Sequence, residues 1–523
     1  MNKVTMPRRA VLQLLGLAPL GHFVRASSLE PLDGVVAQTP DVEVAFTAAA
    51  DDVGLLPGAQ TRVWRFSARV LRGPATTLQP FDDSYLGPVL RVRRGQRVRV
   101  RFVNQLREPS IVHWHGLDVP EVADGHPRFA VGSGAEYVYD FDITNRAGTY
   151  WYHPHPHMRT AAQVYHGLAG LLLVSDPEED ALGLPSGAGE LLCVLQDRRF
   201  DLTNRLVYAG GSADTMTGGM GRGRRTGSGS MAQMMETING WLGDRMLVNG
   251  RVQPSIDVER RTYRVRLLNG SNARIYKLAW SDGSPMVIIG GDGGLLERAR
   301  TQQALTLAPG QRADVLLDLS GHASSTEVRL ESVAFPSAHA GRAGMMGETS
   351  PVPQGAPLTL MTLRTTSVRG RQFAVPERLS THRFREVLAA PVRRVPLTFR
   401  QMNWWIDGRV FDMKNVAAEE TVAPGSTHVW ELVNEINPMG MAMAHPIHVH
   451  GTQFRVLSRT GGSTNALRDG INDAGWTDTV LVLPGETVRV QVTFSTHPGL
   501  YLYHCHILEH EDMGMMRNFR IAE

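Results

Sequence analysis

The chain has 523 residues, 42% of them hydrophobic and 20% charged, a composition typical of a globular protein of about three domains. The 54 basic residues nearly balance the 51 acidic ones, which leaves a net charge of +3. No basic stripe runs along the sequence, so nucleic acid is not an expected partner. The 53 glycines and 30 prolines are typical of short strands joined by many turns.

The first 26 residues have the pattern of an export signal. Arg8 and Arg9 precede an apolar stretch, and Val24-Arg25-Ala26 offers a small-residue cleavage site. Paired arginines indicate the twin-arginine route, which predicts a periplasmic protein. The alternative is a short membrane anchor, but the apolar run is shorter than the ~18 residues that a membrane span needs. No later stretch is long and apolar enough either, so we expect no stable membrane span.

Three stretches, 89–106, 262–280 and 486–506, alternate apolar and polar residues with the period of two that is typical of strands. In each stretch, a Gly, Asn or Pro predicts a turn that closes a pair of strands. The stretches recur at wide, similar intervals, and no long helical periodicity competes with them. The sequence therefore predicts an all-β protein of three related domains, each a Greek-key β-sandwich or barrel.

Polar segments that contain Pro and Gly predict where these domains end. Residues 174–190 and 364–387 have the composition of linkers. Two further segments, 214–237 and 337–357, mix Gly, Ser and Met at low complexity, and we expect both to be mobile surface loops. The predicted domains are 40–180, 188–366 and 388–523.

Histidines recur in pairs with one residue between the two members. Alternate side chains of a strand point to the same face, so both histidines of a pair can approach one metal site from one side. Neutral imidazole is a good ligand for copper, zinc, iron and nickel. A single pair is usually structural, but four pairs provide eight imidazoles and predict a metal centre. The pairs are His113 with His115, His153 with His155, His448 with His450 and His504 with His506.

The fourth pair encloses Cys505, one of only two cysteines, whose side chain points to the opposite face of the strand. Together with His445, His510 and Met515, Cys505 makes the two-His, one-Cys and thioether set of a blue-copper electron-transfer site. Its sulfur would act as a short electron path to both flanking histidines. Zinc fits less well, because a structural zinc uses four ligands at a single site and needs no electron path. Cys193 then has no disulfide partner, and we expect it to be a small core residue.

These motifs resemble those of the multicopper oxidases, and most closely those of bacterial laccases and periplasmic cuprous oxidases. The resemblance covers nearly the whole chain after the export signal, through HWHGLDVP, GTYWYHPHPH, LLNGSNAR, HPIHVHGTQFRVLS and HCHILEHEDMGMM. It implies three tandem cupredoxin-like domains and four copper ions, namely one type 1, one type 2 and a type 3 pair. The trinuclear centre is then expected between the first and third domains.

The resemblance also implies a role for each ligand. The type 1 copper would take His445, Cys505, His510 and Met515, and the type 2 copper would take His113 and His448. One type 3 ion would take His115, His153 and His506, and the other would take His155, His450 and His504. Glu511 and Asp124 match the two acids that deliver protons for the reduction of dioxygen in this family.

By this resemblance the chain is an oxidase that takes single electrons from its substrate at the type 1 copper and reduces dioxygen to water at the trinuclear centre. The expected substrates are phenols, aromatic amines or Cu(I), and the expected form is a monomer. Two alternatives remain. A copper-free exported scaffold protein would share the fold, but the intact ligand set argues against it. A copper nitrite reductase would lack the four histidine pairs.

Methionine is the one clue to the substrate, because thioether sulfur is a soft ligand that favours Cu(I). The alternative is that these residues fill gaps in the core. Cuprous oxidases carry a long Met- and His-rich insert that this chain lacks. They also have an aspartate at the position where this chain has Met441. Asp412, in contrast, matches an acidic position that cuprous oxidases use to bind substrate copper. The methionines in question are Met216, Met220, Met231, Met234, Met235, Met345 and Met346 in the two Met- and Gly-rich segments, and Met413, Met439, Met441, Met443, Met513 and Met516 near the type 1 ligands.

Overall fold

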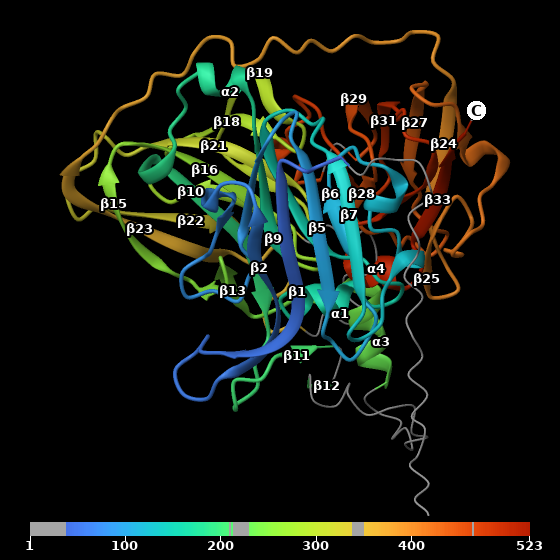
Figure 1. Cartoon of the computed structure of the whole chain (residues 1–523), viewed down its shortest axis with the longest axis horizontal. Coiled ribbons are helices and arrows are strands. Elements are labelled where there is room, and N and C mark those ends of the chain that lie inside the picture. Colours follow the sequence, from blue (N-terminus) through green and yellow to red (C-terminus); the bar gives the residue numbers. More distant parts are fainter. Residues whose placement is uncertain (1–37, 209–210, 213–229, 337–349, 463–464, 523) are drawn as a thin grey trace, which may run out of the picture. The chain divides into compact units, whose positions relative to one another are not determined.

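The computed structural model describes residues 38–208, 211–212, 230–336, 350–462 and 465–522 (Figure 1). The predicted export signal and much of the two Met- and Gly-rich segments lie outside these ranges. The chain divides into Met1–Thr39 and a compact unit, Pro40–Glu523, to which all the structure below belongs. No helix in the described ranges is long and apolar enough to cross a membrane.

The first β-sandwich packs a four-stranded sheet, in the order β2-β1-β5-β7, against a five-stranded sheet, in the order β3-β4-β9-β8-β6. Strand β1 shows why these residues form a sandwich, because alternate side chains from Val42 to Ala48 are buried between the sheets. The strands are β1 (Val42–Val53), β2 (Thr61–Arg72), β3 (Leu78–Gln79), β4 (Val89–Arg93), β5 (Arg97–Asn104), β6 (Val112–His115), β7 (Glu136–Asp142), β8 (Gly148–Pro154) and β9 (Gly170–Ser175).

The second β-sandwich has a seven-stranded sheet, β14-β13-β10-β16-β21-β18-β19, and a five-stranded sheet, β15-β23-β22-β17-β20. Cys193 is buried in its core, as predicted. The strands are β10 (Glu190–Arg198), β13 (Arg245–Val248), β14 (Arg251–Val252), β15 (Ser255–Arg260), β16 (Thr262–Asn269), β17 (Tyr276–Trp280), β18 (Met286–Gly291), β19 (Gly294–Gln302), β20 (Leu305–Leu307), β21 (Arg312–Asp318), β22 (Glu327–Ser332) and β23 (Leu358–Arg369), with a separate hairpin of β11 (Val207–Tyr208) and β12 (Gly211–Ser212).

The third β-sandwich is built of two five-stranded sheets, β25-β24-β27-β31-β29 and β26-β33-β32-β28-β30. Its core contains Cys505 and Met515 among aromatic and branched side chains. The strands are β24 (Val392–Arg400), β25 (Asn403–Ile406), β26 (Thr421–Val422), β27 (Thr427–Asn434), β28 (His445–Val449), β29 (Phe454–Thr460), β30 (Thr479–Val482), β31 (Thr487–Thr493), β32 (Gly499–Cys505) and β33 (Met516–Ile521).

The three sandwiches repeat one pattern of strand pairing. Strand β1 runs parallel to β5, β10 to β16, and β24 to β27. The second strand of each of these pairs then runs antiparallel to β7, β21 or β31. The shared pattern bears out the prediction of three related β-domains.

The three alternating stretches were expected to be paired strands, and this expectation is wrong in one respect. Each does contain two strands with a turn between them, namely β4 and β5, β16 and β17, and β31 and β32. The two strands of each pair belong to opposite sheets of their sandwich, so they do not bond to each other. Alternation fixes which side chains face the core, but it does not fix which strand is the neighbour.

Helices are short, and two of them correct the predicted loops. The predicted linker 174–190 contains α2, which begins after Asp176 because that side chain accepts a hydrogen bond from the Glu179 backbone N–H. The second correction is α3, which occupies the end of the predicted loop 214–237. The helices are α1 (Thr160–Tyr165), α2 (Pro177–Ala181), α3 (Ser230–Asn239) and α4 (Leu508–Asp512). The 3-10 turns are η1 (Ala75–Thr77), η2 (Glu121–Ala123), η3 (Pro127–Phe129), η4 (Gly187–Gly189), η7 (Ala418–Glu420) and η8 (Arg468–Gly470).

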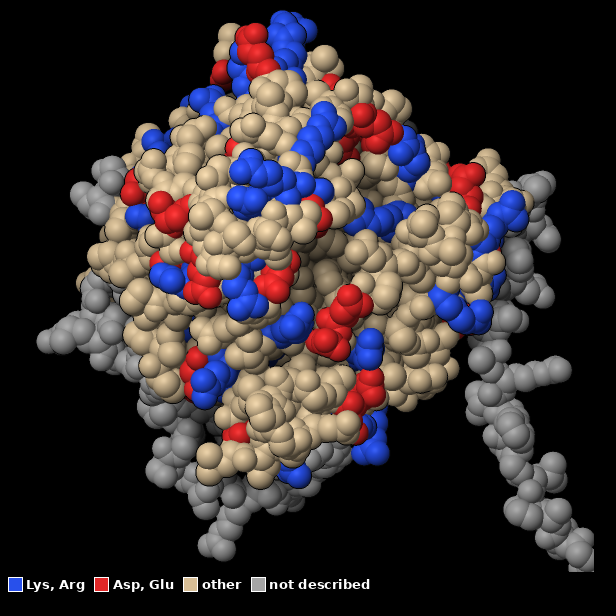
Figure 2. All heavy atoms as spheres, turned by 90° about the vertical axis from the view of Figure 1, so that its left-hand side faces the viewer, with Lys and Arg blue, Asp and Glu red and all other residues tan. Residues whose placement is uncertain are grey.

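Surface charges of both signs are mixed, in keeping with the near balance of the composition. On the face drawn in Figure 2, Lys and Arg side chains are interspersed with Asp and Glu. Exposed ion pairs join the two signs, for example Arg364 with Asp257 and Arg298 with Glu377. Such pairs contribute little to stability, because water already solvates both partners.

Candidate metal centre

The paired histidines lie on neighbouring strands of the first and third sandwiches. In the first, β6 pairs with β8 and places His113 directly opposite His153. In the third, β28 pairs with β32 and places His448 opposite His504. The paired strands β17 and β22 of the second sandwich carry no histidine. The histidines therefore come from the first and third sandwiches, as expected.

In three of the four pairs, the second histidine lies just beyond the end of its strand. These residues are His155, His450 and His506. Their backbone N–H groups still donate to carbonyls of neighbouring segments, at 3.0, 2.9 and 2.7 Å. The alternation of side chains thus continues past the regular strand, and the second imidazole of each pair stays in the same cluster as the first.

The eight imidazoles converge in the interior, where none of them is more than 1% exposed. The Nε2 atoms of His113 and His448 are 3.4 Å apart. The Nε2 atom of His504 lies 3.4 Å from that of His155 and 3.1 Å from that of His450. Nitrogens that bind one metal ion lie about 3 Å apart, because each is about 2 Å from the ion. The arrangement is therefore suited to holding metal ions.

Five ring nitrogens in the cluster have no hydrogen-bond partner among the described residues. They are His115 Nδ1, His153 Nε2, His155 Nδ1 and both nitrogens of His506. A buried polar atom without a partner is costly, and proteins rarely leave several of them together. Imidazole nitrogen is a preferred ligand of copper. Two of the predicted ligand sets bring their ligand atoms within 4.8 Å of one another, so the residues present can hold copper there. These sets are His155 with His450 and His504, and His445 with Cys505 and His510.

Burial keeps the rings of His113, His153, His155 and His504 neutral. Loss of hydration disfavours the charged form, and it lowers the pKa of His153 to about 3. It also places the pKa of His113, His155 and His504 well below the ordinary value, with neighbouring imidazoles adding to the effect for each of them. A neutral ring keeps one lone pair, so these imidazoles can bind a cation at neutral pH without first losing a proton.

The predicted type 1 ligands form a second group, on the other face of β32. Cys505 Sγ lies 3.5 Å from His445 Nδ1 and 3.6 Å from His510 Nδ1. Met515 is fully buried in the same core. Burial raises the pKa of the Cys505 thiol, so in the metal-free protein the sulfur is protonated and a bound cation would have to displace that proton. Cys505 thus belongs to one group, while His504 and His506 beside it belong to the other.

Helix α3 and strand β25 support the Cys505 group, and no sequence motif indicated this. The carbonyl of Ile238, near the end of α3, accepts hydrogen bonds from His510 Nε2 at 2.8 Å and from Trp404 Nε1 at 2.9 Å. The indole of Trp404 lies 4.5 Å from the His445 ring and 5.2 Å from the His510 ring. These contacts fix both rings so that each turns Nδ1 toward the sulfur. Ile238 follows directly after the low-complexity segment 214–237, and nothing in the sequence there indicated such a role.

Both predicted proton donors lie against the histidine cluster. Asp124 Oδ2 accepts from His450 Nδ1 at 2.8 Å, and the Asp124 backbone oxygen accepts from His113 Nδ1 at 2.6 Å. Glu511 lies 3.4 Å from His155 Nε2 and 3.3 Å from His504 Nδ1. Burial raises the pKa of both carboxyl groups well above the ordinary range, and neighbouring acids add to this effect. Each can therefore hold a proton beside the cluster at neutral pH.

A third acid at the cluster, Asp478, was not predicted. Its Oδ1 accepts from His115 Nε2 at 3.0 Å, and its backbone oxygen accepts from His448 Nδ1 at 2.8 Å. Burial alone would raise the pKa of Asp478, but the charge and hydrogen bonds of Arg312, together with smaller contributions from His448, outweigh burial and lower it. Nothing in the sequence around Asp478 indicates a contact with His115, which lies 363 residues away.

The predicted substrate methionines differ in how deeply they are buried. Met443 is buried, and Met235, Met441 and Met513 pack partly against the core that contains Cys505. Met439 is 67% exposed. Asp412 is exposed, and its Oδ1 accepts hydrogen bonds from two backbone N–H groups of its own turn. The predicted loop residues Met216, Met220, Met345 and Met346 lie outside the described residues.

Comparison with known proteins identifies the family. Three multicopper oxidase family models match, at residues 64–179, 222–326 and 389–523. The multicopper oxidase mco of Staphylococcus haemolyticus is 30% identical, over 84% of this chain and 83% of its own. A laccase of Bacillus stratosphericus is also 30% identical, over 86% of this chain and 92% of its own. The chain belongs to the multicopper oxidase family.

A solved structure supports the fold assignment. The McoA multicopper oxidase of Aquifex aeolicus has a TM-score of 0.74 and 34% identity, covering 93% of this chain and 97% of its own. This confirms the predicted all-β architecture of three cupredoxin domains. One relative is named as a cell division protein rather than as an oxidase. This protein, FtsP of Photorhabdus laumondii, is 30% identical over 84% of this chain and 84% of its own.

Proposed function

We propose that this chain is a copper-dependent oxidase that couples one-electron oxidation of its substrate to the four-electron reduction of dioxygen to water. The single observation that carries the proposal is the position of Cys505, whose sulfur lies in one ligand group while His504 and His506 beside it lie in the other. Copper, when bound, supplies the one-electron redox chemistry and the site for dioxygen. We expect four ions, bound as the sequence motifs imply.

The chain's own residues connect and protect the two groups. Cys505 provides a short covalent path along β32 from one group to the other. Trp404 and the Ile238 carbonyl hold the rings of the Cys505 group, and the surrounding core excludes water from it. Glu511 and Asp124 hold protons at atoms that face the histidine cluster, where the reduction of dioxygen consumes them.

The experiment that tests this function measures oxygen uptake by the copper-loaded protein with a phenolic dye as reductant. We expect uptake of one dioxygen for four electrons withdrawn, with no accumulation of hydrogen peroxide. A protein that bound copper but consumed no oxygen with phenols, aromatic amines or Cu(I) would contradict the proposal.

The substrate class is phenols, aromatic amines or Cu(I). The relative named laccase supports small aromatic reductants, while the soft sulfur atoms of Met441 and Met513, which pack against the core that contains Cys505, support Cu(I). Turnover rates for Cu(I) and for a phenol, in the wild type and in a variant with Met441→Leu and Met513→Leu, separate the two. If the substitutions lower only the Cu(I) rate, these methionines serve Cu(I).

A copper-free scaffold protein is the second candidate, and the FtsP relative favours it. The buried ligand groups argue for the enzyme, because a scaffold has no need of imidazoles and a thiol whose ligand atoms converge to within 4.8 Å of one another. Addition of copper to the metal-free protein decides between them, since only the enzyme would turn intensely blue.

The location and form of the protein complete the proposal. The twin-arginine pattern in residues 1–26 supports export to the periplasm, and we expect a monomer with domains at 40–180, 188–366 and 388–523. Cell fractionation with Arg8 and Arg9 changed to Lys tests the route, because the twin-arginine pathway requires the arginine pair. A protein that still reached the periplasm would contradict the assigned route.

A further inference from the structure

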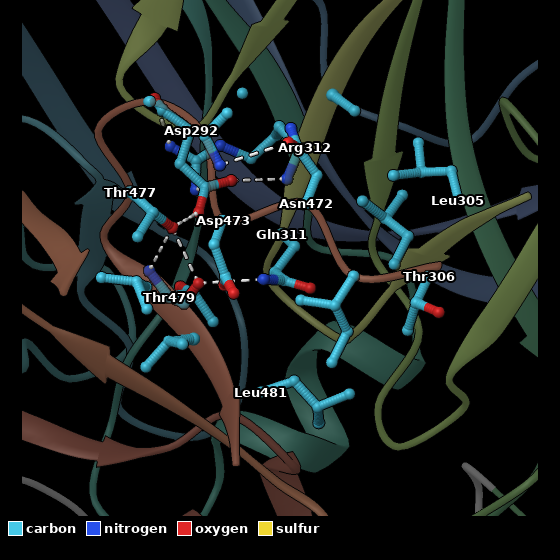
Figure 3. Close-up of a pocket in the computed structure, with 18 of the residues that line it drawn as sticks. Asp292, Leu305, Thr306, Gln311, Arg312, Asn472, Asp473, Thr477, Thr479 and Leu481 are labelled. Carbon is cyan, nitrogen blue, oxygen red and sulfur yellow. Dashed lines mark hydrogen bonds and ion pairs between the residues drawn. The ribbon is translucent and has the colours of Figure 1, made fainter. Parts of the chain in front are cut away.

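A buried arginine of the second sandwich reaches the histidine cluster through an aspartate of the third. Arg312 begins β21 and lines a small pocket together with Asp292, Thr477 and Thr479 (Figure 3). The Thr479 hydroxyl lies 3.3 Å from His115 Nε2, so this wall of the pocket adjoins the cluster. The pocket therefore lies at the boundary of the second and third sandwiches, next to residues that the first sandwich supplies.

Every N–H of the Arg312 guanidinium has an acceptor. The Nε atom donates to the Thr149 carbonyl on β8 at 2.9 Å. The two terminal nitrogens donate to Asp478 Oδ1 and Oδ2 at 2.7 and 2.6 Å, and also to the carbonyls of Gly310 and Asp292, both at 3.1 Å. Five donors in a rigid fork are thus divided among all three sandwiches. The bidentate pair fixes the plane of the Asp478 carboxylate.

That carboxylate in turn sets the orientation of a cluster imidazole. His115 donates from Nε2 to Asp478 Oδ1 at 3.0 Å, so its lone pair lies on Nδ1, which has no partner among the described residues. His448 donates from Nδ1 to the Asp478 backbone oxygen and turns Nε2 toward His113. If the Asp478 carboxylate moved, His115 would lose the bond that selects its metal-facing nitrogen.

We propose that Arg312 is a positioning residue for the histidine cluster, acting through Asp478 on the orientation and tautomer of His115. The second sandwich, which supplies none of the cluster histidines, thereby helps to build the centre. The inference rests on the proposed function, because ring orientation matters here only if the cluster binds copper. Groups that orient metal-bound histidines commonly change metal affinity roughly 10–100-fold when they are removed.

The experiment compares the copper-loaded protein with three arginine variants by titration with a chelator and by electron paramagnetic resonance. Arg312→Met removes the fork, and Arg312→Lys keeps the charge but reaches fewer acceptors. Arg264→Met is the matched control, because Arg264 is equally buried and pairs with Asp314 and Glu179 but contacts no cluster histidine. Asp478→Asn is the fourth variant, and it leaves Arg312 and the packing in place if Arg312→Met does not fold.

We expect Arg312→Met and Asp478→Asn to release cluster copper at roughly 10–100-fold lower chelator concentration than the wild type. The resonance signal of the non-blue copper should change, while the blue colour of the Cys505 site remains. Arg312→Lys should recover part of the loss, and Arg264→Met should match the wild type.

Two results would overturn the inference. In one, Arg312→Met holds cluster copper as tightly as the wild type and its resonance signal is unchanged. If Arg312→Met does not fold, the same result for Asp478→Asn counts against the inference. In the other, Arg264→Met loses copper to the same extent, which would indicate general loosening between the sandwiches. A wild-type protein that held no copper in the cluster would instead overturn the proposed function, and this inference with it.

Discussion

At the residue scale, the most informative position is Cys505. Its thiol is fully buried, and burial raises its pKa, so without a metal it is an inert core residue. The only other cysteine, Cys193, is also buried with a raised pKa, and its sulfur faces Met361 rather than imidazoles. The two cysteines differ in their neighbours. Two imidazoles lie beside the Cys505 sulfur, and together these three groups could bind a metal ion.

Replacement of each cysteine by serine tests this distinction. Cys505→Ser should abolish the blue colour and the oxidase activity, because a hydroxyl does not replace a thiolate at a blue-copper site. Cys193→Ser should keep both and lower the free energy of unfolding by about 1–3 kcal/mol, since it buries a hydroxyl in an apolar core. Absorption spectra and urea unfolding measure the two effects. A blue, active Cys505→Ser protein would refute the assignment of the sulfur.

The acids of α4 allow a second test at this scale. Glu511 faces His155 and His504, whereas Glu509, also buried, bonds to Tyr208 and Asn272. Glu511→Gln keeps the shape of the side chain but removes its exchangeable proton.

We expect Glu511→Gln to slow oxygen reduction roughly 10²-fold or more, without changing the rate at which substrate bleaches the blue colour in the absence of oxygen. Glu509→Gln is the control and should reduce oxygen at nearly the wild-type rate. Stopped-flow reoxidation separates the two steps. Equal slowing in both variants would show that packing of α4, rather than proton delivery, is responsible.

At the scale of elements, the turns of the second sandwich support the cluster. Gly310 lies between β20 and β21 with φ +83°, and a Cβ there would lie 2.9 Å from the His506 ring. A larger residue would therefore meet both an unfavourable backbone conformation and a histidine of the predicted metal centre. Gly283 has a similar φ, +78°, but nothing lies within 4 Å of its Cβ position.

The pair Gly310→Ala and Gly283→Ala separates these two effects. Both should lose about 1–2 kcal/mol of unfolding free energy from the left-handed backbone conformation. Only Gly310→Ala should also lose copper from the histidine cluster, because it displaces His506. Urea unfolding of the metal-free proteins and copper analysis of the loaded ones measure this. If both variants kept their full copper, His506 would not depend on this turn.

Elements also show how far the sequence could predict the structure. The histidine pairs could be predicted because strand alternation is a local rule, and His113 and His115 do share one cluster. The sheet partners of β4 and β5 could not, since alternation does not specify a neighbour. The Ile238 carbonyl and Arg312 could not either, because each acts over a contact between distant segments and neither has a local pattern of its own.

At the scale of the whole molecule, the metal-free protein concentrates neutral imidazoles where the three sandwiches meet. The unfolded chain binds protons at histidine below about pH 6.5, whereas the folded chain excludes them. Burial lowers the folded-state pKa of each of these rings, so each contributes stability that is complete above pH 6.5 and is lost as pH falls. The rings are those of His113, His115, His153, His155, His450, His504 and His506.

The unfolding free energy of the metal-free protein should therefore fall steeply between pH 6.5 and pH 5. Each ring contributes up to ~1.4 kcal/mol per pH unit. Burial raises the pKa of seven described acids, which acts in the opposite direction over this range, but burial lowers the pKa of twelve described histidines, so the histidines outnumber them. The acids are Asp118, Asp124, Asp292, Glu486, Glu509, Glu511 and Asp512, and the further histidines are His126, His157, His166, His382 and His428. Urea midpoints at a series of pH values measure the slope. A midpoint that stayed constant or rose on acidification would contradict neutral burial of the histidines.

In the proposed enzyme, one strand end contributes ligands to two kinds of copper site. The copper content of the loaded protein, measured on the same sample as its visible spectrum, tests this arrangement. We expect four ions per chain together with an intense blue band, and we expect Cys505→Ser to remove the band but to leave the ions of the histidine cluster. A single ion per chain, or a full complement of copper with no blue band, would contradict it.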